Sequence, residues 1–251
     1  MDTLQRFSNR VENYVRYRPN YPGDVIVFLQ QQNILKQESV IADIGSGTGI
    51  STELFLKNGN TVYGVEPNKE MRETAEKLLI GYKKFKSIDA TAENTTLQNE
   101  SIDIIISGQA FHWFDKEKCK KEFKRILKKN GSVVLMWNDR RMDSSEFLIA
   151  YESLLKKFGT DYLKVNHKNI DDEQFDDFFG NKASLKSFEN YQYFDFVGLK
   201  GRLLSSSYVP AEVEANFEPM INALEDVFEK YNSNGKVTFE YDTKIYYGQL
   251  K

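Results

Sequence analysis

The chain has 251 residues, of which 40% are hydrophobic and 14% aromatic, and its formal net charge is −3. This composition excludes an intrinsically disordered chain, and the charge gives no general attraction to nucleic acid. The single cysteine, Cys119, excludes an intrachain disulfide, and the charged segment 1–22 lacks the apolar core of a signal peptide. No apolar run reaches the roughly 18–20 residues of a membrane span. We therefore expect a soluble cytoplasmic protein in a reducing compartment, with no membrane partner.

The segment before residue 140 alternates predicted strands and helices. Runs rich in Val and Ile predict five strands, at 39–45, 60–67, 82–90, 101–110 and 132–138. Between them, helical spacing of apolar residues predicts helices at 50–59, 68–79 and 115–131. Asn68 and Asp115 are predicted N-caps, and Gly131 is the predicted end of the third helix. Apolar strands separated by helices indicate a doubly wound α/β domain with a mostly parallel sheet.

After residue 140 the pattern is less regular. Two more helices and two more strands are predicted, at 144–159, 210–231, 187–196 and 236–250. Pro219 is expected to interrupt the second of these helices. The acidic, irregular segment 160–183 is typical of an insertion. We thus predict a single domain over 1–251, with an N-terminal lid and helix at 1–38 and a partly helical cap at 140–200, inserted after the fifth strand.

Three glycines follow the first predicted strand, at 45, 47 and 49. Ordering glycine is costly, so such a cluster indicates a sharp turn or the close approach of a ligand. A dinucleotide is bound by G-x-G-x-x-G, whereas this loop is G-x-G-x-G, which disfavours a nicotinamide-dependent oxidoreductase. Glu66 ends the second strand about 20 residues beyond the loop, where a carboxylate can accept both hydroxyls of a ribose. Loop and carboxylate together predict a nucleoside ligand.

The motif D-x-G-x-G-x-G at 43–49, followed by Val-Glu-Pro at 65–67, resembles the S-adenosylmethionine site of class I methyltransferases. Segments 17–22, 89–115 and 237–248 are similar to the subgroup related to trans-aconitate methyltransferase. The resemblance implies a Rossmann-like sheet of seven strands, the last of them antiparallel. It also implies S-adenosyl-L-methionine as cofactor and S-adenosyl-L-homocysteine as product. The acidic run 171–177 lacks the spacing of a calcium loop, so no metal is predicted.

The resemblance assigns the cofactor contacts position by position. Gly45 and Gly47 would let the backbone approach the methionine moiety, and Thr91 would replace an aspartate that receives the adenine amino group in relatives. The N-terminal segment would fold over the cofactor with Arg18 pairing its carboxylate, the alternative being a surface helix that ends at Pro19. The predicted cofactor-binding residues are Tyr14, Arg18, Asp43, Gly45, Ser46, Gly47, Gly49, Glu66, Pro67, Asn68, Met71, Thr91, Ala92, Glu93 and Gln109.

The reacting end is expected at residues 107–115, which follow the fourth strand. Methyl transfer from a sulfonium is an in-line displacement, in which the protein aligns the acceptor and excludes water. Gln109 and His112 are the candidate catalytic residues: Gln109 would form a wall, and His112 would orient or deprotonate a hydroxyl or amine. The alternative for His112 is a structural hydrogen bond in a tight loop. The predicted acceptor-pocket residues are Phe111, His112, Trp113, Arg140, Ser206 and Tyr208.

These observations predict a methyltransferase acting on a small molecule. A carboxylate acceptor would need no base and would involve Arg140 or Arg141. Two alternatives stay open: a non-catalytic regulator that binds S-adenosylmethionine, and a methyltransferase acting on nucleic acid. The net charge and the lack of a base-stacking platform disfavour the latter, and no nucleic acid partner is expected. Cys119 is predicted to be a buried structural thiol, and His167 a solvated side chain.

Overall fold

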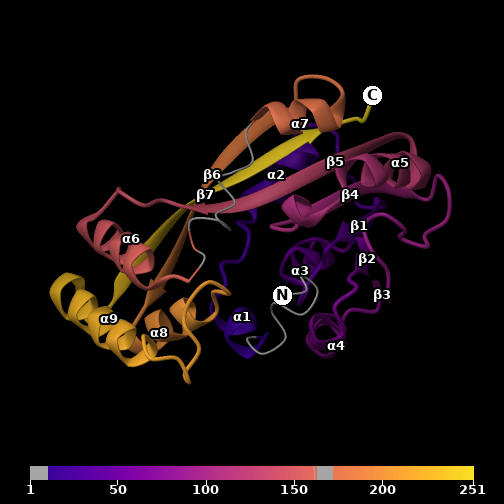
Figure 1. Cartoon of the computed structure of the whole chain (residues 1–251). Helices are drawn as coiled ribbons and strands as arrows, with labels where there is room; N and C mark the ends of the chain where they lie inside the picture. Colours follow the sequence, from indigo (N-terminus) through magenta and orange to yellow (C-terminus); the bar gives the residue numbers. More distant parts are fainter. Residues whose placement is uncertain (1–10, 161, 163–171) are drawn as a thin grey trace.

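The computed structural model describes residues 11–160, residue 162 and residues 172–251 (Figure 1). His167 lies outside the described residues, and so does the side chain of Tyr14, whose backbone belongs to the first helix. No helix in these ranges combines the length and apolar character that a membrane crossing requires.

A seven-stranded sheet with the order β3-β2-β1-β4-β5-β7-β6 forms the centre of the molecule. Its strands are β1 (Val40–Ile44), β2 (Thr61–Val65), β3 (Phe85–Ile88), β4 (Ile102–Gly108), β5 (Leu127–Arg140), β6 (Ser184–Phe194) and β7 (Val237–Gly248). The first five are parallel, and β7 runs antiparallel to both β5 and β6. The predicted fold is confirmed, including the antiparallel last strand. The strand order reverses between β1 and β4, which is where ligands bind in doubly wound sheets.

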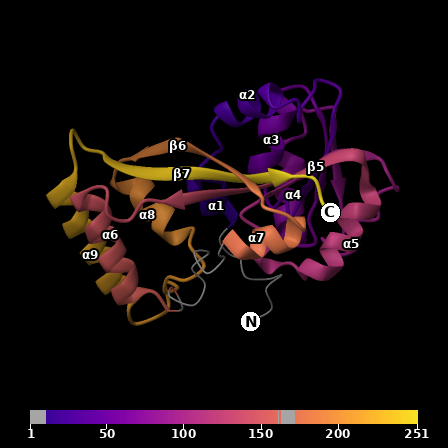
Figure 2. The ribbon, with the colours of Figure 1, turned by 90° about the horizontal axis from the view of Figure 1, so that it is seen from above.

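Helices flank this sheet on both faces. They are α1 (Val11–Tyr17), α2 (Asp24–Gln31), α3 (Ile50–Lys57), α4 (Lys69–Leu78), α5 (Lys116–Ile126), α6 (Glu146–Phe158), α7 (Asp172–Phe179), α8 (Phe196–Leu204) and α9 (Phe217–Tyr231), with a 3₁₀ turn η3 (Phe111–Trp113). One core lies between the sheet and α2, α3 and α4, and a second lies between the opposite face and α5 and α7. A third core joins α6, α8 and α9 to one end of β7, as Figure 2 shows.

Helix α5 ends five residues before the predicted end. Its predicted N-cap is confirmed, because the Asp115 side chain accepts a hydrogen bond from the Lys118 amide. At the other end, Leu127 adopts extended backbone angles and pairs with Ile102 of β4, so the chain enters β5 directly. Gly131 therefore lies within β5 and is no helix cap. A Cβ atom there would lie 3.2 Å from the carbonyl oxygen of Asp103, so glycine lets the two strands approach.

Two other predictions are wrong for local reasons. Pro219 does not interrupt α9, since it occupies the first turn, where a missing N–H group removes no helical hydrogen bond. The segment 160–183 was expected to be irregular, but it contains α7. Phe175, Phe178 and Phe179 share one face of that helix and are buried against the second core.

Candidate functional site

The glycine loop joins β1 to α3 at the carboxyl edge of the sheet. Gly45, Gly47 and Gly49 have φ angles of +69°, +55° and +89°, a region that side chains rarely adopt. A Cβ atom on Gly45 would lie 2.6 Å from the Cβ of Ala110, and one on Gly49 would lie 2.7 Å from Leu79. A Cβ on Gly47 would meet no atom within 4 Å. Packing thus requires glycine at 45 and 49, whereas Gly47 exposes its backbone to open space.

Asp43 lies buried behind this loop. Its Oδ2 accepts hydrogen bonds from Ser51 Oγ at 2.7 Å and from Thr52 Oγ1 at 2.6 Å. Its Oδ1 is buried and has no partner in the described part of the chain. Burial raises the pKa of Asp43 to about 6, against the opposing effect of the two hydroxyl donors. The carboxyl group therefore ties the end of β1 to the first turn of α3.

Glu66 directly follows β2 and faces the loop. Its Oε2 accepts the Gly47 amide at 2.8 Å, and its Oε1 accepts the Asn68 amide at 2.8 Å. Asn68 in turn caps α4, since its side chain accepts the Met71 amide at 2.9 Å. Burial raises the pKa of Glu66, while the two amide donors lower it. This carboxylate is thus fixed in place at a cavity wall.

Two adjoining cavities open at the loop. One, the glutamate cavity, has a volume of about 200 Å³. The other, the arginine cavity, has a volume of about 160 Å³. They share walls at Gly45, Gly47, Gly108, Gln109 and Trp113. The remaining walls of the glutamate cavity are Glu66, Pro67, Asn68, Met71, Thr91, Ala92, Glu93, Ala110 and Phe114. One elongated ligand could therefore span both spaces across the glycine loop.

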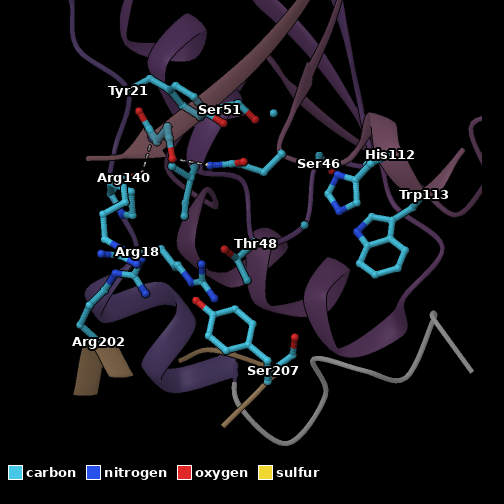
Figure 3. Close-up of a pocket in the computed structure, with 18 of the residues that line it drawn as sticks. Arg18, Tyr21, Ser46, Thr48, Ser51, His112, Trp113, Arg140, Arg202 and Ser207 are labelled. Atoms are coloured by element: carbon cyan, nitrogen blue, oxygen red, sulfur yellow. Dashed lines mark hydrogen bonds between the residues drawn. The ribbon is translucent and has the colours of Figure 1, made fainter. Parts of the chain in front are cut away.

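The arginine cavity has two chemically different sides. Arg18, Arg140 and Arg202 lie on one side and His112 and Trp113 on the other, as Figure 3 shows. Among the described residues that line this cavity there is no carboxylate. The positive charge of its walls therefore favours an anionic or strongly polar occupant.

The arginines are held by different partners. Arg18 donates through Nη2 to the carbonyl oxygen of Ser205 at 2.9 Å. Arg140 forms an ion pair with Glu152, with Nη2 and Oε2 2.5 Å apart, and Tyr162 donates to the same carboxylate oxygen at 2.7 Å. Arg140 is thus fixed, and its charge is compensated behind the cavity wall.

The comparisons with known proteins address the domain that carries this loop. Residues 42–135 match the family model described as a methyltransferase domain. This segment is therefore similar to methyltransferase domains. An uncharacterized methyltransferase-like protein of Schizosaccharomyces pombe is 31% identical over 141 residues, which cover 55% of this chain and 53% of that protein. A protein of Saccharomyces cerevisiae named as a probable S-adenosylmethionine-dependent methyltransferase is 30% identical over 168 residues, which cover 63% and 57%.

The matched segments span about half the length of these curated relatives. Among solved structures, a proposed type II methyltransferase of Anaeromyxobacter dehalogenans is similar over 93% of this chain and 98% of its own, with a TM-score of 0.71. The sequence identity is 17%, so this likeness supports the Rossmann-like methyltransferase fold.

Most of the predicted cofactor-binding residues line the two cavities. The glutamate cavity brings together Gly45, Gly47, Glu66, Pro67, Asn68, Met71, Thr91, Ala92, Glu93 and Gln109. Arg18 and Ser46 line the arginine cavity. Asp43 and Gly49 line neither, because Asp43 is turned toward α3 and Gly49 is packed against Leu79.

Some of the predicted acceptor residues line a cavity, and others do not. His112, Trp113, Arg140 and Tyr208 line the arginine cavity. Phe111 does not: its ring is fully buried, 4.6 Å from that of Phe178. In a 3₁₀ turn, successive side chains point in different directions, so Phe111 enters the core.

Ser206 and Arg141 also lie away from the cavity walls. Ser206 is fully buried behind the wall, where its hydroxyl accepts from Arg202 at 3.4 Å, and Ser207 lines the cavity in its place. Arg141 lies outside the cavity and pairs with Asp242 at 2.7 Å and Glu189 at 3.2 Å. Its positive charge is therefore paired with these two carboxylates outside the cavity.

Sequence reasoning missed several cavity residues, namely Tyr21, Thr48, Ser51, Asn138, Tyr162, Ser207 and Arg202. The position of Arg202 in the sequence could have indicated that its side chain is buried. It lies three residues after Leu199 and one before Leu203, both fully buried, so it falls on the inner face of α8. A charged residue on an apolar helix face indicates either a buried pair or a ligand site.

The described part of the chain holds no group of three or more acidic, histidine or cysteine side chains placed to bind a metal ion. Cys119 is fully buried in the second core, and burial raises the pKa of its thiol.

Proposed function

We propose that the protein is an S-adenosylmethionine-dependent methyltransferase that transfers a methyl group in line to a small-molecule acceptor. One observation carries the proposal: a loop with three glycines at positive φ angles is hydrogen-bonded to the carboxylate of Glu66 at the place where two cavities meet. The match of residues 42–135 to a methyltransferase domain supports it. The likeness to the trans-aconitate methyltransferase subgroup stays a prediction.

The residues at the loop fit this cofactor. Gly47 leaves open space where a side chain would stand, and the buried Oγ1 of Thr48 has no hydrogen-bond partner among the described residues. Each oxygen of Glu66 accepts one amide and retains capacity for a further donor such as a ribose hydroxyl. When bound, the cofactor supplies a methyl group on a positively charged sulfur, which is also the leaving group.

We assign the cofactor contacts to the walls of the two cavities. Glu66 would hold the ribose, and Pro67, Asn68 and Met71 would flank the adenine. Arg18 would pair with the methionine carboxylate. This division places the nucleoside in the glutamate cavity and directs the methionine end toward the arginine cavity.

Gln109 lies in the wall that the two cavities share. Its φ angle is +59°, a strained value for a side-chain-bearing residue, and its amide donates to the Met136 carbonyl at 2.9 Å. This geometry turns the chain from β4 into η3, which carries His112 and Trp113 to the cavity. We propose that His112 orients or deprotonates an acceptor hydroxyl or amine, whereas a carboxylate acceptor would need no base.

Calorimetric titration with S-adenosylhomocysteine and, separately, NADH tests the proposal. We expect micromolar binding of the first and none of the second. Glu66→Gln should weaken binding about ten- to hundredfold, since it removes a charge-assisted hydrogen bond. Glu73→Gln is the matched control: its side chain is exposed on α4, pairs with Lys69 and should leave affinity unchanged. Binding of NADH, or equal effects of the two substitutions, would contradict the proposal.

A further inference from the structure

Arg202 differs from the described arginines that form ion pairs. Its side chain is 6% exposed, yet it lines the arginine cavity. Its Nε donates to the Tyr241 hydroxyl at 3.3 Å, and its Nη1 donates to the hydroxyls of Ser205 and Ser206 at 3.5 and 3.4 Å. All of these acceptors are neutral and the contacts are long. No described carboxylate lies within ion-pair distance of this guanidinium.

Three other arginines of the described chain illustrate the usual arrangement, in which a carboxylate faces the guanidinium. Arg140 pairs with Glu152, Arg125 with Glu122, and Arg141 with Asp242. A guanidinium keeps its charge in proteins, and burying a charge without a counter-ion is expensive. A buried charge that lines a cavity and lacks a carboxylate partner therefore points to a counter-ion supplied by the ligand.

The surroundings of Arg202 select the kind of counter-ion. The planar fork of a guanidinium matches the paired oxygens of a carboxylate or a phosphate. Tyr162 and Tyr208, whose ring centroids lie 4.9 Å apart, line the same cavity and carry hydroxyl groups. Arg18 is assigned by the proposed function to the cofactor, so the anion at Arg202 belongs to the second substrate.

We propose that the arginine cavity holds the methyl acceptor through an anionic group, a carboxylate or phosphate, bound to Arg202. The inference rests on the proposed function and names its substrate class: small acids. The guanidinium lowers the nucleophilicity of the anchored oxygens, because its positive charge and its hydrogen bonds withdraw electron density from them. The methylated atom is therefore a different group of the acceptor, directed toward His112 and Trp113 across the cavity (Figure 3).

Calorimetry of the full chain, saturated with S-adenosylhomocysteine, tests this inference without requiring the true acceptor. The probes are succinate, inorganic phosphate and neutral succinamide. We expect at least one of the two anions to bind and succinamide to fail, and the tighter anion identifies the anchoring group. Arg202→Met should weaken anion binding at least tenfold and change S-adenosylhomocysteine affinity less than threefold. Arg141→Met, outside the cavity, is the matched control and should leave anion affinity unchanged.

A purely structural role for Arg202 predicts a different result. If Arg202 serves the ligand, the thermal midpoint of ligand-free Arg202→Met should equal or exceed that of the wild type, because an apolar side chain replaces an uncompensated charge. A lowered midpoint with retained anion affinity would overturn the inference. If Arg202→Met does not fold, Arg202→Lys replaces it, since it keeps the charge but loses the fork. Unchanged anion affinity in Arg202→Lys would equally overturn the inference.

The two proposals fail in distinguishable ways. Binding of S-adenosylhomocysteine without binding of either anion would overturn this inference and leave the proposed function standing. The same holds if succinamide binds as tightly as succinate, or if the anions compete with S-adenosylhomocysteine. Failure of S-adenosylhomocysteine to bind would overturn both.

Discussion

The buried carboxyl group of Asp43 should make the folded protein less stable as pH rises from about 4 to about 6. Burial raises the pKa of this group from 3.8 to about 6. In the unfolded chain the proton is released near pH 4, whereas the folded protein retains it up to about pH 6. Between these values the folded state binds more protons, so the free energy of unfolding falls as pH rises, and the whole loss is present above pH 6.

The size of the effect follows from the shift. A difference of about two pKa units corresponds to about 3 kcal/mol. A domain is typically stable by about 5–15 kcal/mol, so a loss of this size is readily measured. Glu66 has a raised pKa as well, and its contribution has the same sign. A comparison between variants is therefore needed to isolate Asp43.

Asp43→Asn provides that comparison. Asparagine has nearly the same shape and can still accept from Ser51 and Thr52, but it does not titrate. Urea unfolding at pH 4, 5, 6, 7 and 8 is followed by the fluorescence of Trp113 and Trp137. The free energy of unfolding of the variant, minus that of the wild type, should rise by about 3 kcal/mol between pH 4 and pH 7. The part of the Glu66 contribution that does not depend on its repulsion with Asp43 cancels in this difference.

Glu73→Gln removes an exposed carboxylate and serves as the control, for which the difference should stay flat. A flat difference for Asp43→Asn would refute the reasoning, because it would mean that Asp43 ionises normally in the folded protein. A difference that falls with pH would mean that the charged carboxylate is stabilised and that the hydroxyl donors outweigh burial.

Two further substitutions test the packing around the site. Gly45→Ala should lower the free energy of unfolding by about 1–3 kcal/mol, since its Cβ would lie 2.6 Å from that of Ala110 at a φ of +69°; urea unfolding that shows no loss would contradict the assigned loop geometry. Phe175→Ala should cost about 3–5 kcal/mol, because its buried ring stacks 3.9 Å from Tyr246. Tyr193→Ala, at a side chain 64% exposed, should change stability by less than about 0.5 kcal/mol, and a similar loss in both variants would argue against the buried position of α7.

The sheet could be predicted because its signals are local. Each of the strands β1, β2 and β4 is a short apolar run, followed by a glycine, a proline or a polar turn. Element ends were less predictable where tertiary contacts decide them. Leu127 continues the apolar face of α5, yet it pairs with Ile102, so the helix stops where sheet pairing begins.

Helix α7 shows how composition can hide periodicity. The sequence DEQFDDFF contains four acidic residues, which suggest an exposed irregular segment. Its three phenylalanines nevertheless share the i, i+3 and i+4 spacing of a helix face. Burial of those rings against α5 and the sheet decides the structure, and the carboxylates of Asp176 and Asp177 lie on its outer part.

The two cavities differ in how well the sequence could indicate their residues. The residues of the glutamate cavity come from the ends of parallel strands and the turns that follow them, so a contiguous motif could indicate them. The arginine cavity is assembled from the segment after α1, the glycine loop, η3, the end of β5, the segment after α6 and the end of α8 with the residues that follow it. Arg18, Arg140 and Arg202 are brought together by the fold alone, and no spacing in the sequence indicates their proximity.

This division has a consequence for acceptor choice. The family match ends at residue 135, so it includes Glu66 and the glycine loop but none of Arg140, Tyr162 and Arg202. The matched segment thus holds most of the residues that we assign to the cofactor, together with His112 and Trp113, whereas Arg18 lies before it. The remaining part of the arginine cavity is built on the long ends of β5, β7 and β6 and on the helices packed there. Acceptor specificity should therefore change with substitutions at these later positions while cofactor affinity is retained, as we expect for Arg202→Met.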